Sequence, residues 1–307
     1  MSALVDHVAR DEASVIEKNT IRDASPRRRR NAPRHVANTI LTGYLPLIIA
    51  TLIVGLPLIW MLLGSLKQPG EIVTNELVVF PASPSFDAYV SASERVDFVT
   101  LFRNSLIVTV VGASIKVLLA LTTAYALVFV RFPFKNVVFV GILVALMVPP
   151  QVSLLPNFTL IASLGGINTY WGIILPGLGT AFGTFLLRQQ FLALPPEILE
   201  AAELDGASHA RRLFRIVAPI TVPTIATVAL VTIVNEWNEY IWPLVITTDD
   251  RMMTLPVGLT LLQNIEGDAS AYPVLMAGAV LVIVPVLIVF AFLQRYIVAG
   301  LTQGAVK

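Results

Sequence analysis

The sequence predicts an all-α polytopic membrane protein, and three observations support this fold class. Of the 307 residues, 56% are hydrophobic and 13% are charged, whereas about 25% of the residues in an ordinary soluble domain are charged. Six apolar windows are long enough to cross a bilayer as helices. Lys and Arg gather on one side of those windows. Cysteine is absent, which excludes disulfides, thiolate metal sites and a cysteine nucleophile.

The six windows define the expected transmembrane spans. A helix needs about 20 mostly apolar residues to cross roughly 30 Å of hydrocarbon. Five windows of about this length contain no Asp, Glu, Lys or Arg, and they lie at residues 40–66, 137–155, 170–187, 217–234 and 272–293. The sixth window, at residues 105–130, is equally apolar except for Lys116. We expect the helix of the fifth span to continue to residue 240.

The distribution of Lys and Arg predicts the orientation of the spans. With six spans, sixteen of these residues lie on the side of the two termini and four lie on the opposite side. Cytoplasmic loops carry the excess of Lys and Arg, so both termini are expected in the cytoplasm. Residues 1–39 are polar and contain four successive arginines, Arg27 to Arg30. They predict a disordered basic tail that attracts anionic lipid, ahead of a transmembrane domain at residues 40–307.

A dense polar insert between the fourth and fifth spans has the start and stop signals of a short helix. Pro196 suits a first helical turn, and Glu197 and Glu200 favour the positive N-terminal end. Gly206 permits the left-handed residue that ends a helix. The sequence therefore predicts a rigid cytoplasmic elbow at about residues 196–207.

The residues around this elbow predict how it continues and what it offers to a partner. Ser208 can cap a second helix, which we expect to run through Pro219 into the fifth span. The small side chains of Ala201 and Ala202 would let another surface approach closely. The alternative interpretation is a solvated polar loop.

The elbow resembles the cytoplasmic motif of the permease subunits of ATP-binding-cassette importers. That motif reads Glu-Ala-Ala, three residues, Gly, nine residues, Ile, one residue, Leu-Pro. This chain has, at that spacing, Glu200, Ala201, Ala202, Gly206, Ile216 and Pro219. Ala218 stands where the family usually has leucine, which loosens the last packing contact. The resemblance implies that the elbow is a coupling helix that docks into a groove of an ATPase subunit, with Asp205 and Arg211 among its coupling residues.

The resemblance covers nearly all of residues 40–307, including the stretches NSLIVTVVGASIK, GGINTYWGIILP and NEWNEYIWPL. The chain resembles the carbohydrate-type permeases. Among these, it is most similar to the permeases for glycerol-3-phosphate and glycerophosphodiesters. The resemblance implies the type I importer permease fold in the cytoplasmic membrane of a prokaryote. The implied cargo is sn-glycerol-3-phosphate or a glycerophosphodiester such as glycerophosphocholine. A di- or oligosaccharide carried by the same machinery is the alternative, and a secondary transporter is a weaker one.

The resemblance also implies the partners. The sequence contains no G-x-x-x-x-G-K-[ST] phosphate loop, so the chain is not expected to be an enzyme or to bind a cofactor of its own. ATP and Mg²⁺ would be used by two partner ATP-binding subunits. A second, homologous permease subunit would complete a heterodimer, and an extracytoplasmic solute-binding protein would deliver the substrate. Membrane lipid is the remaining partner, and nucleic acid is not expected.

Lys116 is the first candidate for contact with the substrate. A lysine near the middle of a span costs about 2.5–3.5 kcal/mol, so it should face the protein interior or water. One hypothesis is that it stabilises an anionic phosphate in transit or pairs with an acid of the partner permease. The alternative is that it snorkels to the membrane surface or makes a fixed ion pair between subunits.

A polar stripe at the end of the fifth span is the second candidate. Asn235, Asn238, Glu239 and Trp242 are spaced i, i+3, i+4 and i+7, which places them on one face if the helix continues that far. They are expected to meet the hydroxyls or a choline-like cation of the substrate. The alternative is that the aromatic residues only anchor the helix at the membrane surface.

Prolines and glycines gather within two of the spans. Their main clusters are Pro149 with Pro150, and Pro176 with Gly177 and Gly179. Such residues free backbone groups that protein or cavity water must satisfy, which suits hinges and gates beside a path. Other classes of protein fit less well. All three histidines lie outside the spans and H-E-x-x-H is absent, which disfavours an intramembrane metalloprotease.

Overall fold

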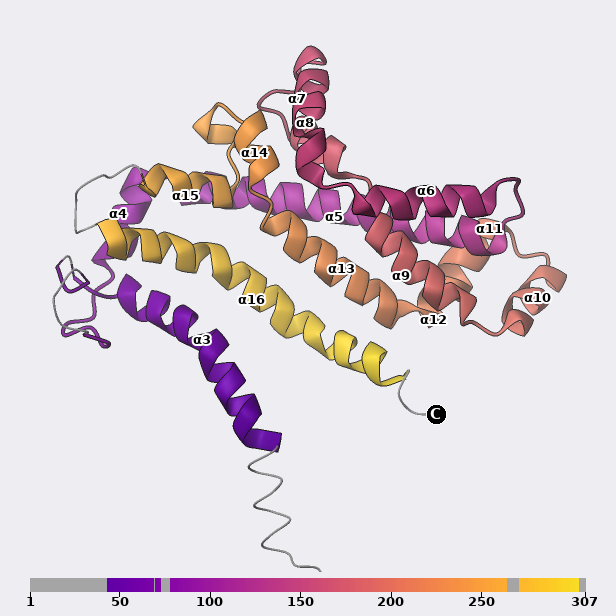
Figure 1. Cartoon of the computed structure of the whole chain (residues 1–307), viewed down its shortest axis with the longest axis horizontal. Coiled ribbons are helices and arrows are strands. Elements are labelled where there is room, and N and C mark those ends of the chain that lie inside the picture. Colours follow the sequence, from indigo (N-terminus) through magenta and orange to yellow (C-terminus); the bar gives the residue numbers. More distant parts are fainter. Residues whose placement is uncertain (1–42, 69, 73–77, 264–270, 304–307) are drawn as a thin grey trace, which may run out of the picture. The chain divides into compact units, whose positions relative to one another are not determined.

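The computed structural model describes residues 43–68, 70–72, 78–263 and 271–303, and every regular element in these ranges is a helix (Figure 1). The predicted all-α fold class is confirmed. The chain divides into two units, residues 1–57 and residues 58–307. The expected basic tail, residues 1–39, lies outside the described residues. In the first unit the described residues are those that lead into and begin α3, and all contacts discussed below lie within the second unit.

Three helices in the described part of the chain are long and apolar enough to cross a membrane without a break: α3 (Leu45–Ser65), α5 (Phe98–Phe129) and α16 (Ala271–Gln303). α5 begins before the apolar window at residues 105–130. The window was limited by the charge of Arg103, but a charged residue does not end a helix. A helix needs only backbone hydrogen bonds and a cap. Asp97 is that cap, since its carboxylate accepts a hydrogen bond from the backbone N–H of Thr100 at 3.1 Å.

Two further apolar segments are bent where the sequence places its proline and glycine clusters. α6 (Lys135–Met147) meets the segment Pro150–Ser163, which ends in α7 (Leu154–Ser163), at 93°. Pro150 is the first residue of that second segment, and its ring cannot continue the helix of α6. α8 (Tyr170–Ile174), extended by the short turn η3 (Leu175–Gly177), meets α9 (Ala181–Leu192) at 50°.

A third bend corrects the prediction for the start of the fifth span. α11 (His209–Arg212), the π-helical turn η4 (Leu213–Val217) and α12 (Ala218–Ile220) form one arm, and α13 (Val222–Trp237) leaves it at 86°. The helix expected to run from Ser208 through Pro219 into the fifth span is therefore not continuous, because it bends between Ile220 and Val222. Pro223 stands in the first turn of α13, where a missing N–H is tolerated. Counting each bent pair as one crossing gives up to six candidate spans.

The core of the second unit forms where α5, α9 and α13 pack together. Its buried residues include Ala120 and Ala124 on α5, Phe191 on α9 and Val228 on α13. Gly183 on α9 permits this close packing, because a Cβ there would lie 2.9 Å from Val228 and 3.0 Å from Ala120. α16 lies along α13 on its other side (Figure 1).

Shorter helices close one end of the bundle: α4 (Asp87–Arg95), α14 (Ile241–Ile246), the turn η5 (Asp250–Met252) and α15 (Leu255–Gln263). Asn104 on α5 holds this end together. Its amide donates to the carbonyls of Arg251 and Met253 at 2.8 and 2.9 Å, and its oxygen accepts from the Tyr170 hydroxyl at 2.7 Å. The buried amide is thus fully satisfied, and it fixes the start of α15 and of α8 against α5.

Candidate functional site

The predicted elbow is a helix whose ends are satisfied by its own residues. α10 (Pro196–Leu204) begins with Pro196 and is followed by Gly206 at φ +69°, in the left-handed region. The N–H of Ala207 donates to the carbonyl of Ala202 at 3.0 Å, and the N–H of Gly206 donates to that of Glu203 at 3.0 Å. This pair of bonds is a Schellman motif, and it rigidifies the end of the helix.

The exposed surface of α10 differs from the prediction in one residue. Ala202 is buried, as is Ala207, so these two side chains close the motif from inside. Only Ala201 of the two alanines is open to a partner, because its side chain is exposed. Leu204 is 90% exposed although it is apolar. The other exposed residues of the predicted coupling set are Glu200, Asp205, Gly206, Arg211 and Pro219.

Side-chain bonds tie the elbow to the arm that follows it. Ser208 caps α11 by accepting from the N–H of Arg211 at 3.4 Å. Arg212 donates to the carbonyl of Ala207 at 2.8 Å and forms an ion pair with Glu203 at 3.1 Å. α10 and α11 therefore form one connected unit, which lies beyond the end of α9 (Figure 1).

One side-chain hydrogen bond joins this unit to the long helix α5. The hydroxyl of Tyr125 lies 3.1 Å from Nδ1 of His209, and the two rings meet edge to face. Tyr125 is itself buried and packs on Phe129, which touches Phe191 of α9. These contacts link the elbow to the C-terminal end of α5 and to α9.

Lys116 lies inside the bundle and is paired with an acid of its own chain. Its ammonium forms a hydrogen-bonded ion pair with Glu236 on α13, and the side chains are 15% and 13% exposed. Two glycines make room for the pair. A Cβ at Gly112 would lie 2.7 Å from the carboxylate of Glu236, and one at Gly177 would lie 3.3 Å from the Lys116 nitrogen. The pair stands where α5, η3 and α13 meet.

The ion pair opens onto a polar cavity of about 250 Å³. Glu239 and Trp242 also line it, so the cavity holds one lysine and two carboxylates among the described residues. The Trp242 ring nitrogen donates to the carbonyls of Gly172 and Ile173 at 3.2 and 3.0 Å, which fixes the ring. The segment after α6 adds two polar amides, those of Gln151 and Asn157, and the remaining wall is mostly apolar, with Val108, Leu154 and Ile173 among its residues.

The four residues of the predicted stripe do not lie on one continuous helix, and two of them line the polar cavity. α13 ends at Trp237 and α14 begins at Ile241, so no continuous helix carries the four residues. Glu239 and Trp242 line the cavity, whereas Asn235 and Asn238 are not part of its wall. Glu239 is exposed, as are both asparagines. The Asn238 amide instead donates to the carbonyl of Val234, which closes the end of α13.

Glu236 is the residue that the sequence pattern did not single out. It lies 120 positions from Lys116, and no local spacing relates the two residues. The one available signal was physical, because a lysine at that depth needs a nearby counter-charge.

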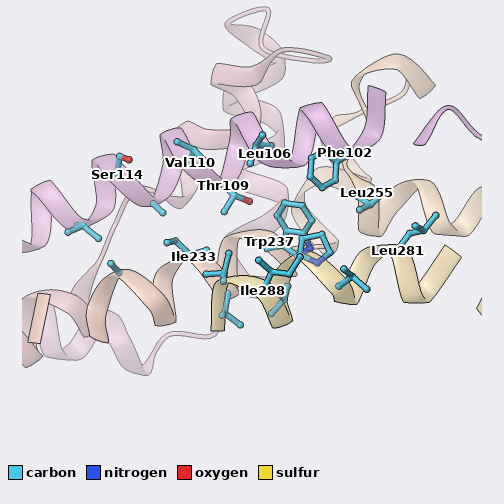
Figure 2. Close-up of a pocket in the computed structure, with 18 of the residues that line it drawn as sticks. Phe102, Leu106, Thr109, Val110, Ser114, Ile233, Trp237, Leu255, Leu281 and Ile288 are labelled. Atoms are coloured by element: carbon cyan, nitrogen blue, oxygen red, sulfur yellow. The ribbon is translucent and has the colours of Figure 1, made fainter. Parts of the chain in front are cut away.

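A second, larger cavity is apolar and shares no lining residue with the first. It has a volume of about 1080 Å³ and is bounded by α5, α13, α15 and α16. Figure 2 shows Phe102 and Trp237 meeting edge to face at one end, with ring centroids 5.6 Å apart, and Ser114 at the other end. Thr109 and Ser114 contribute the hydroxyls, and no charged side chain is found among the described residues that line it.

Comparisons with known proteins decide the class. The model of the family described as "Binding-protein-dependent transport system inner membrane component" matches residues 116–303, which is more than half of the chain. The chain belongs to this family. The permease is thus an inner-membrane, multi-pass component of a transport system, and its lack of an enzymatic role agrees with the prediction.

Curated relatives place the permease in the carbohydrate-uptake type but name different cargoes. It is 35% identical over 254 residues to the arabinooligosaccharides transport system permease protein AraQ of Halalkalibacterium halodurans, covering 82% of this chain and 90% of the relative. It is 34% identical over 277 residues to the sn-glycerol-3-phosphate transport system permease protein UgpE of Brucella suis, covering 88% and 98%.

A solved structure supports the fold of the permease. The matching chain comes from a bacterial ABC transporter involved in the import of the acidic polysaccharide alginate, with a TM-score of 0.74 and 24% identity. The match covers 88% of this chain and 98% of that chain. The predicted ABC permease fold is confirmed.

Proposed function

We propose that this permease passes a glycerophosphodiester, such as glycerophosphocholine, through the polar cavity during ATP-driven import. The observation that carries the proposal is the order of charges in that cavity, where Lys116 is paired with Glu236 while Glu239 lies beside Trp242. A choline diester has one negative and one positive charge. Its phosphate can meet Lys116, and its trimethylammonium group can meet the Glu239 carboxylate and the Trp242 ring.

Free sn-glycerol-3-phosphate fits this cavity less well. A dianion would meet two carboxylates and a lysine that Glu236 already neutralises. A neutral oligosaccharide is the second candidate, because carboxylates and the amides of Gln151 and Asn157 can bond its hydroxyls. The arabinooligosaccharide relative favours this second candidate as well.

Uptake by the complete transporter tests the cargo. Membrane vesicles that contain the permease with its natural partners would be loaded with ATP and offered labelled glycerophosphocholine, sn-glycerol-3-phosphate or an arabinose trisaccharide. We expect saturable, ATP-dependent uptake of glycerophosphocholine. Uptake of the trisaccharide alone would support the second candidate, and uptake of sn-glycerol-3-phosphate alone would contradict the argument from charge.

We further propose that α10 is the coupling helix and docks on a partner ATP-binding subunit. The exposed Leu204 supports this, since an apolar side chain that is 90% exposed on a capped, rigid helix suits a groove in a partner. The hydrogen bond between Tyr125 and His209 would then carry the displacement into α5. The implied assembly contains a second permease, two ATP-binding subunits and an extracytoplasmic binding protein.

Replacing Gly206 tests this coupling role. Its φ of +69° strains any side chain with a Cβ, at a cost of about 1–2 kcal/mol, although nothing lies within 4 Å of the position. Gly206→Val should leave insertion intact, keep ATP hydrolysis and lower uptake more than tenfold. The matched control is Gly141→Ala, because that position on α6 also has open space around it. Normal uptake by Gly206→Val would reject the role.

The proposed orientation places α10 and both termini in the cytoplasm. The natural absence of cysteine allows a clean test, because a single cysteine can be introduced without background. Ser208→Cys, at the exposed elbow, should react with a membrane-impermeant thiol reagent only in inverted vesicles. Reaction in right-side-out vesicles would reverse the orientation.

A further inference from the structure

Two cations lie on the neighbouring helices α6 and α9, near the end of α9 from which the elbow follows, and neither lines the polar cavity. Arg188 stands four residues before the end of α9, and Lys135 begins α6. The guanidinium carbon of Arg188 lies 3.9 Å from the ring centroid of Phe139, which stacks on Phe185 at 6.5 Å. Phe139 lies one helical turn after Lys135 on α6, so Arg188 packs on the part of α6 that Lys135 begins. The arginine is thus held in place by packing and not by an acid.

The cation of Arg188 lacks a counter-charge within the described part of the chain. Its Nε is buried and has no hydrogen-bond partner there. The ion pairs that join described residues are Lys116 with Glu236 and Arg212 with Glu203, and neither includes these two cations. Lys135 donates to the carbonyls of Val128 and Val130 at 2.8 and 3.3 Å, which positions its ammonium without neutralising it. A buried, unpaired donor of this kind favours an anion beside it.

The surroundings of the two cations point to lipid as the source of that anion. Large apolar side chains are exposed beside Lys135, with Phe134 at 77% and Val137 at 67%. The cations lie where helices end, which is the depth of the phosphate layer in a bilayer. An arginine fork binds a phosphate through two hydrogen bonds, and a neighbouring lysine adds a point charge.

We propose that Arg188 and Lys135 form a binding site for the phosphate of an anionic phospholipid, with the acyl chains lying on the apolar residues around it. Under the proposed orientation this lipid belongs to the cytoplasmic leaflet, beside the base of the coupling elbow. The site is separate from the polar cavity, so its test does not depend on the cargo. It would anchor α6 to α9 at the point where the elbow joins the bundle.

Lipid analysis of the purified complete transporter tests the site. The complex would be extracted in mild detergent, and the ratio of phosphatidylglycerol to phosphatidylcholine retained would be measured after exchange into an equal mixture of the two. Arg188→Gln keeps a long side chain over Phe139 but removes the charge, and Lys135→Gln removes the second charge. Each should lower the retained ratio about fivefold. Arg215→Gln, at an exposed position of η4, is the matched control and should leave the ratio unchanged.

Two other outcomes would overturn the proposal. If inorganic phosphate at millimolar concentration displaces phosphatidylglycerol completely, the site binds free anions and not lipid. If the ratio is the same in both variants and the wild type, a carboxylate of a partner subunit satisfies Arg188. Should Arg188→Gln fail to assemble, Lys135→Gln and Arg188→Lys carry the test, because Arg188→Lys keeps the charge but loses the fork and should lower the ratio less.

Discussion

The two cavities of the bundle differ in size and in chemistry, and they share no lining residue. The larger one, of about 1080 Å³, is lined by aliphatic and aromatic side chains with two hydroxyls. The smaller one, of about 250 Å³, holds the Lys116–Glu236 pair, Glu239 and Trp242. A solute with hydroxyls and charges loses its hydration on entry, so it needs the groups that only the smaller cavity offers.

The comparison teaches that volume alone does not locate the path of a polar solute. An apolar groove between membrane helices is ordinary surface for lipid tails or for another helix. A charged pair inside the bundle is costly, and the protein maintains it only with support from neighbouring elements. Here Gly112 and Gly177 leave room for that pair, which supports the proposal that the cargo passes through the smaller cavity.

Removing one partner of the ion pair should have the largest effect. Lys116→Met would leave the Glu236 carboxylate buried without its counter-charge, at a cost of about 3–5 kcal/mol. We expect the yield of assembled transporter to fall at least tenfold, as measured by co-purification of the partner subunits.

The double variant Lys116→Met with Glu236→Gln separates structure from transport. It removes both charges, so assembly should recover to within about threefold of the wild type. If Lys116 also meets the phosphate of the cargo, uptake stays low despite assembly. Recovery of uptake together with assembly would leave the pair a purely structural role.

The glycine beside the pair gives the next largest effect. Gly112→Ala would place a Cβ 2.7 Å from the Glu236 carboxylate, so the pair must shift. We expect uptake by the assembled complex to fall about fivefold to tenfold. Gly141→Ala is the matched control, since it has nothing within 4 Å and should gain up to about 1 kcal/mol of helix stability. Equal uptake by the two variants would show that the pair has no effect on the path.

Local features of the site could be predicted from the sequence, whereas its long-range contacts could not. The capped elbow follows from Pro196, Gly206 and Ser208, because caps and left-handed residues depend on near neighbours. The partner of Lys116 depends on how α5 and α13 pack, and the spacing of residues along the chain does not predict that packing. The bend at Thr221 was missed because an apolar window gives length but not direction.

The prediction of a polar stripe at the end of the fifth span was wrong for a related reason. Helical spacing of Asn235, Asn238, Glu239 and Trp242 was read as one face, and the prediction required the helix to continue. The chain instead leaves the helix at Asn238 and restarts at Ile241, which turns Glu239 and Trp242 into the cavity and leaves both asparagines outside. Periodicity therefore found two of the cavity residues but could not exclude the other two.

Glu239 and Trp242 should affect cargo binding more than turnover. Glu239→Gln keeps the size of the side chain and removes the charge that would attract a choline group, so KM for glycerophosphocholine should rise about threefold to tenfold while kcat changes little. Trp242→Phe keeps an aromatic ring but loses the bonds to Gly172 and Ile173. It should raise KM for every cargo. A KM that stays constant in both variants would place the binding of cargo elsewhere.

Filling the apolar cavity should have the smallest effect. Ser114 lies on its wall and is exposed, so Ser114→Leu adds an apolar side chain without burying a polar group (Figure 2). If polar cargo does not pass through this cavity, uptake should stay within twofold of the wild type in the same vesicle assay. A fall of more than tenfold with normal assembly would indicate that the cargo passes through the apolar cavity. The ion pair would then be a structural feature beside the path, and the order of effects predicted above would reverse.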